Sequence, residues 1–172
     1  NIAGNYFDRN IDQTRFTQEL RLSSNPGEKL QWVAGVSYYR DEAKLFSMRN
    51  VFVYGPPVSG FDNLHQTTTG QAVFGEVSYP VIDRLKLSLG GRYTREQKEY
   101  DGQFYSDGTP GTVPVFAEAG KKDFNFWTGR ASLSYEWSDK FTSYASISRG
   151  YKSGGFGTFN SLMWAGVPRT PY

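Results

Sequence analysis

Apolar and polar residues alternate strictly in six segments of the chain. The clearest is residues 85–96, in which Leu87 and Leu89 alternate with Lys86 and Ser88. Because successive side chains of a β-strand point to opposite faces, this pattern predicts strands that are apolar on one face and polar on the other. The predicted strands are residues 15–24, 30–41, 71–79, 85–96, 126–137 and 141–152.

The predicted connections are alternately short and long. Residues 25–28, 80–84 and 138–140 form short links, whereas residues 42–70 and 97–125 form long ones, and an outer loop begins near Ser153. Short periplasmic turns and long extracellular loops are typical of outer-membrane β-barrels. Compact soluble domains rarely carry two structureless loops of this length. The pattern therefore predicts an all-β fold, an antiparallel transmembrane β-barrel segment of about six strands.

Composition supports this interpretation. The 172 residues include 13 Phe, 12 Tyr, 4 Trp and 19 Gly, a mixture that favours strands and turns. The net charge is +2 and no long basic run occurs, so nothing indicates binding to nucleic acid. The mean hydropathy of −0.57 is compatible with a barrel, whose strands are apolar on one face only. No stretch of about 18 apolar residues predicts a transmembrane helix.

Outward aromatic residues concentrate near the ends of the predicted strands. Such residues form two girdles in a membrane barrel, one at each lipid–water boundary. The alternative is that they form the core of a soluble β-sandwich, because alternation alone fits both architectures. The residues near the short turns are Trp32, Tyr79, Trp137 and Phe141, and those near the long loops are Tyr38, Tyr93, Trp127 and Tyr151.

Six strands are too few to close a barrel of useful diameter, and an open sheet has two unpaired edges that lipid does not tolerate. The chain also opens without a signal peptide. We therefore expect residues 1–172 to be one part of a larger closed barrel, with the remaining strands outside this chain.

The polar faces supply the candidate functional residues. Inward charges are expected to line the lumen, namely Glu19, Arg21, Glu76, Lys86, Arg92, Arg130 and Glu136. Ligand contacts are expected from the long loops and the upper lumen, where cations and aromatic rings suit anionic, aryl-bearing chelates. These candidates are Arg49, Tyr54, Phe61, His65, Phe104, Tyr105 and Trp164, although packing within the loops is the alternative role for each.

No catalytic, metal or cofactor site is predicted. His65 is the only histidine, and the chain contains no cysteine that could complete a metal site with it. No nucleophile motif or phosphate-binding loop is present, and the glycines near residue 154 follow a strand without preceding a helix. We therefore expect a protein that is not an enzyme, although some outer-membrane barrels are hydrolases.

Four segments resemble the barrels of TonB-dependent outer-membrane receptors. The resemblance implies a barrel of about 22 strands with a plugged lumen. It also implies a plug domain and a TonB-contacting segment that precede this chain, and uptake of a ferric siderophore or similar large chelate across the outer membrane with energy relayed by TonB. The segments are Gln18–Ser24, Phe74–Tyr79, Leu89–Glu96 and Tyr144–Phe156.

Two other functions fit the same sequence pattern. A passive porin-like channel would share the alternation and the loop lengths but would have no plug and would not use TonB. A soluble β-sandwich binding module would bury the outward aromatic residues and would fold without detergent.

Overall fold

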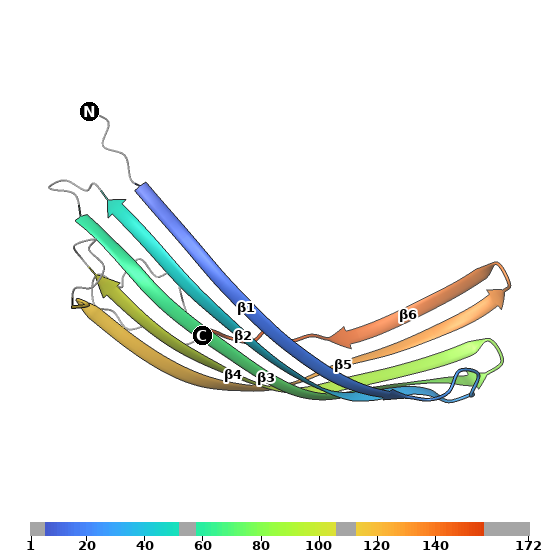
Figure 1. Cartoon of the computed structure of the whole chain (residues 1–172). Coiled ribbons are helices and arrows are strands. Elements are labelled where there is room, and N and C mark those ends of the chain that lie inside the picture. The colour runs from blue at the N-terminus through green and yellow to red at the C-terminus, as the bar shows by residue number, and fades with distance from the viewer. Residues whose placement is uncertain (1–5, 52–57, 106–112, 157–172) are drawn as a thin grey trace.

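The computed structural model describes residues 6–51, 58–105 and 113–156, which form one antiparallel sheet (Figure 1). Neighbouring strands in the sheet are consecutive in the sequence. Among the described residues no helix is long and apolar enough to cross a membrane. The strands are β1 (Tyr6–Ser23), β2 (Gln31–Val51), β3 (Val58–Ile82), β4 (Leu85–Tyr105), β5 (Phe116–Ser138) and β6 (Phe141–Arg149).

The sheet is a single curved layer with two unlike faces (Figure 1). Residues that are paired across neighbouring strands point to the same face and form a row across the sheet. One row on the convex face contains Trp32, Val77, Leu89, Ala131 and Ile147. The apolar band is the part of the convex face that extends from the row of Leu85 to the row of Tyr93, both of which belong to β4. Opposite the apolar band the concave face carries charged residues, among them Glu76, Lys86 and Arg92.

The described residues form a single layer and not the two packed sheets of a β-sandwich. In the described part of the chain no second sheet packs on the apolar band, and its side chains remain open, with Leu20 65% and Ile147 75% exposed. A sandwich would bury such residues between its two sheets. In the same residues β1 pairs only with β2 and β6 only with β5, so both edges of the sheet are open.

The predicted long loops at residues 42–70 and 97–125 are wrong for most of their length. Strands β2 and β3 continue through the first range, and β4 and β5 continue through the second. The reason is that the convex face turns polar beyond the apolar band, in the row that contains Gln18, Gln71 and Arg95. Beyond the band apolar residues such as Leu64 and Phe104 lie on the concave face, so the pattern of the apolar band does not continue, although the hydrogen-bonded ladder does.

The short turns agree with the prediction, and residues 24–30, 83–84 and 139–140 separate the strands there. Gly27 has a φ of 92° and Arg84 a φ of 68°, so both adopt the left-handed conformation that reverses the chain. The backbone amide of Ser24 donates to the carbonyl oxygen of Trp32 at 3.0 Å, which closes the first turn.

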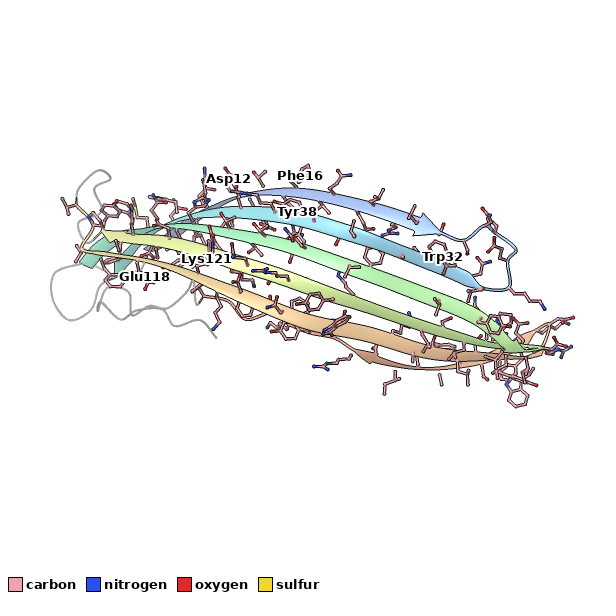
Figure 2. All side chains as sticks on the ribbon, turned by 90° about the horizontal axis from the view of Figure 1, so that it is seen from below. Asp12, Phe16, Trp32, Tyr38, Glu118 and Lys121 are labelled. Atoms are coloured by element: carbon pink, nitrogen blue, oxygen red, sulfur yellow. The ribbon has the colours of Figure 1, made fainter. Side chains whose placement is uncertain are left out.

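Most of the predicted outward aromatic residues lie on the convex face. Figure 2 shows Trp32 near the short-turn end, with Phe16 and Tyr38 further along their strands. The rings of Tyr93 and Trp127 meet across β4 and β5, with centroids 4.8 Å apart.

The prediction that Tyr151 lies on the outward, convex face is wrong. Strand β6 ends at Arg149, and the Tyr151 ring stacks on Phe126, which belongs to a concave row, with centroids 4.1 Å apart. The chain leaves the sheet before Tyr151, so the alternation of β6 no longer fixes the side of this ring.

Candidate functional site

The concave face gathers the predicted inward charges on one wall. The strand register places Glu19, Arg21, Glu76, Lys86, Arg92, Arg130 and Glu136 on this face. Lys86 and Glu136 lie nearest the short turns, whereas the other charges border a groove of about 490 Å³. The use of these residues as lumen contacts stays a prediction.

Arg92 is fixed by contacts from three strands. Its Nη2 donates to Ser37 Oγ at 2.8 Å, and its Nε donates to Thr94 Oγ1 at 3.2 Å. Its guanidinium lies 5.6 Å from the centroid of the Phe74 ring, and that of Arg21 lies 5.8 Å from the same ring. Such cation–aromatic contacts hold the two cations against the wall.

A second groove, of about 600 Å³, lies further from the short turns. Arg15 of β1 forms an ion pair with Asp41 of β2, and Nε2 of Gln13 donates to both oxygens of the same carboxylate at 2.9 Å. Asp41 is 8% exposed, and these donors offset the cost of burying its charge.

Tyr39, Glu96 and Lys98 form a polar network in this groove, beyond the apolar band. The Tyr39 hydroxyl donates to Glu96 Oε2, and Lys98 Nζ lies 3.4 Å from Glu96 Oε1. Burial and the adjacent carboxylate raise the pKa of Tyr39 well above its ordinary value. Burial alone would raise the pKa of Glu96, but hydrogen bonds from Ser153, Tyr39 and Lys98 outweigh it and lower that pKa. Glu96 therefore stays ionised and Tyr39 stays protonated at neutral pH.

The chain after β6 lies across the concave face, where the sequence predicted the start of an outer loop. Lys98 Nζ donates to Ser153 Oγ at 2.9 Å and to the Gly154 carbonyl oxygen at 2.7 Å. Phe156, 7% exposed, stacks on Tyr100 with centroids 5.4 Å apart. We call residues 150–156 the strap. Phe156 joins a buried apolar cluster with Leu45, Leu64, Tyr100 and Phe104.

The described members of the seven predicted ligand contacts lie on both faces of the sheet. Phe61, His65 and Tyr105 belong to convex rows, and Phe61 stacks on Tyr105 with centroids 4.3 Å apart. Phe104 lies on the concave face in the buried apolar cluster. The backbone of Arg49 belongs to β2, but its side chain, Tyr54 and Trp164 lie outside the described residues.

His65 is therefore a strand residue rather than a loop residue. Within residues 6–51, 58–105 and 113–156, no three His, Cys, Asp or Glu side chains are grouped as they would be around a metal ion.

Sequence reasoning missed Arg15, Tyr39, Asp41, Glu96 and Lys98 as a connected group. The available signal was the alternation of positions along each strand. Asp41 continues the concave positions of β2, and Glu96 and Lys98 continue those of β4. Alternation assigns a residue to a face, but it does not predict which residues of distant strands touch.

Comparisons with known proteins identify the family of this wall. The model of the family described as TonB dependent receptor-like, beta-barrel matches residues 1–170. The ferric yersiniabactin uptake receptor FyuA from Yersinia pestis superposes with a TM-score of 0.81 at 20% identity, over 99% of this chain and 26% of that one. The siderophore receptor PiuA from Acinetobacter baumannii gives 0.59 at 14% identity, over 81% of this chain and 24% of that one. The chain thus spans about a quarter of each of these receptors and belongs to the TonB-dependent receptor β-barrel family.

Proposed function

We propose that this chain is the wall segment of an outer-membrane receptor that takes up a ferric siderophore or a similar large chelate with energy supplied through TonB. The observation that carries the proposal is the family match over residues 1–170. The two-faced sheet agrees with it, because an apolar convex band suits lipid and a charged concave wall suits a water-filled or plugged lumen.

Two partners follow from the proposal. The apolar band contacts outer-membrane lipid, and the concave wall contacts a plug domain carried by a part of the protein outside residues 1–172. The open edges at β1 and β6 then pair with further strands of the same barrel. The names of the two similar receptors favour ferric siderophores over other cargo.

The test is uptake by the complete receptor in cells. Cells that lack their own siderophore receptors would express it, with and without TonB, and receive ⁵⁵Fe complexes of a catecholate, a hydroxamate and a carboxylate siderophore. The proposal expects accumulation of at least one complex, and loss of that accumulation when TonB is removed or the proton gradient is collapsed.

Uptake that persists without TonB would indicate a passive porin-like channel and contradict the energised mechanism. Neither binding nor uptake of any complex by correctly folded receptor would contradict the proposed cargo class and leave the barrel assignment intact.

A further inference from the structure

The strap is held mainly by side chains of the sheet, together with a backbone β-bridge at Phe156. Beyond Arg149, where β6 ends, the chain crosses the concave side of the sheet (Figure 1). Lys98 of β4 supplies two hydrogen bonds, and Phe126 of β5 stacks on Tyr151. These contacts come from strands other than β6, so they set where the strap lies on the wall.

The end of the strap lies over Gly120, which has no side chain. A Cβ atom added to Gly120 would lie 2.8 Å from Cε1 of Phe156. The Phe156 ring therefore occupies space that any other residue at position 120 would fill. A glycine in a strand interior costs stability, so its presence here fits a close approach by another group.

Lys98 connects the strap to the second groove. Its side chain borders that groove together with Arg15, Arg92 and Glu96, and it also holds Ser153. Lys152 is exposed on the strap itself. The strap thus lies beside a groove that contains three cations and three carboxylates, in the part of the wall beyond the apolar band.

We propose that the strap forms the inward rim of the site that binds the chelate in this receptor, and that Lys98 is the residue that positions the strap. This inference rests on the proposed function. Lys98 is assigned a positioning role because its Nζ is already occupied by Ser153, Gly154 and Glu96. Loss of Lys98 should release the strap and weaken ligand capture without removing a direct ligand contact.

The first measurement locates the strap in the complete receptor. Ser153→Cys keeps the Gly154 carbonyl as an acceptor for Lys98 and introduces a thiol into a region without cysteine. Its reaction with a membrane-impermeant maleimide on intact cells should be slow, and should become faster when Lys98→Met is added. Lys86→Met is the matched control, because it removes a concave cation that borders neither groove.

The second measurement is the dissociation constant for the ⁵⁵Fe complex that the wild-type receptor binds. Two hydrogen bonds from a charged donor hold the strap, so Lys98→Met should raise this constant about tenfold, against less than about twofold for Lys86→Met. Gly120→Ala provides a second perturbation, since it must displace Phe156 but leaves every charge intact. Gly91→Ala is its control, because a Cβ there meets nothing within 4 Å.

The outcomes separate the two proposals. Faster labelling and weaker binding in Lys98→Met and Gly120→Ala, but in neither control, would support the strap as the rim. Faster labelling with unchanged binding would overturn it and leave the receptor function standing, and unchanged labelling would overturn the anchoring by Lys98. If folded wild-type receptor binds none of the three complexes, both the cargo and the rim are refuted.

Discussion

An arginine placed on the apolar band should destabilise the barrel strongly at its centre and weakly at its edge. Leu89 is the middle outward position between Leu85 and Tyr93 of β4, and it is 45% exposed beside Val77 and Ala131. The eight steps from Leu85 to Tyr93 span about 27 Å along the strand at about 3.4 Å per residue. A strand tilt of about 45° reduces this to about 19 Å across the membrane, so Leu89 lies about 10 Å from either boundary.

The expected magnitude follows from this depth. An outward arginine near the midplane costs about 2–4 kcal/mol, whereas one near a boundary costs about 0–1 kcal/mol. Leu89→Arg should therefore lower the free energy of unfolding by the larger amount and Leu85→Arg by the smaller. Ser88→Arg is the matched control, because Ser88 is adjacent in sequence but lies on the concave face.

The assay is equilibrium unfolding in guanidinium of the complete barrel folded into lipid vesicles, followed by tryptophan fluorescence. Equal losses of stability in Leu89→Arg and Ser88→Arg would refute the assignment of the convex face to lipid. Equal losses in Leu89→Arg and Leu85→Arg would instead refute the depth that we derive from the strand rows.

Three further predictions concern the concave wall. Gly70→Ala should destabilise the barrel by about 1–3 kcal/mol, because its Cβ would lie 2.2 Å from Cε1 of the Tyr39 ring, whereas Gly91→Ala should be near neutral in the same unfolding assay. If the charge of Arg92 contacts the plug domain, Arg92→Glu should make the plug of the complete receptor more susceptible to protease, whereas Arg92→Lys, which keeps the charge, should not. Equal susceptibility of the two variants would contradict this charge contact. The lowered pKa of Glu96 implies stabilisation that is complete at neutral pH and is lost as the pH falls through that lowered pKa. Glu96→Gln should therefore reduce the acid-dependent part of the unfolding free energy, and identical pH profiles would contradict this.

Alternation predicted the faces of the sheet because lipid and water impose opposite demands on successive residues. The pattern placed Leu89 and Arg92 on opposite faces, and the register agrees. It failed beyond the apolar band, where the convex face of β2 to β5 turns polar and apolar residues such as Leu64 and Phe104 lie on the concave face instead. There the strands are stabilised by backbone pairing and by contacts between residues that are distant in the sequence, which local alternation does not predict.

The contacts of the site are non-local, which is why the sequence did not predict them. The Tyr39 hydroxyl bonds to a carboxylate 57 residues away, and Lys98 bonds to Ser153, 55 residues away. The strap was missed for a related reason. The alternation continues to residue 152, but the anchors that turn the chain inward, at Lys98 and Gly120, come from β4 and β5.

Glycines on the two faces have different surroundings. On the concave face a large side chain lies over the glycine on the paired strand, with Phe74 over Gly35 and Tyr39 over Gly70. On the convex face an added Cβ at Gly91 would meet nothing within 4 Å.

The glycines on the concave face affect how far the neighbouring side chains project from the wall. A large side chain that covers a cross-strand glycine lies flat on the wall, whereas the same side chain opposite a bulky neighbour would project into the lumen. Phe74, held flat by Gly35, in turn supports the guanidinium groups of Arg21 and Arg92. The concave glycines therefore keep the wall thin and its cations in fixed positions. Under the proposed function, both properties would help the lumen to hold a plug and admit a large chelate.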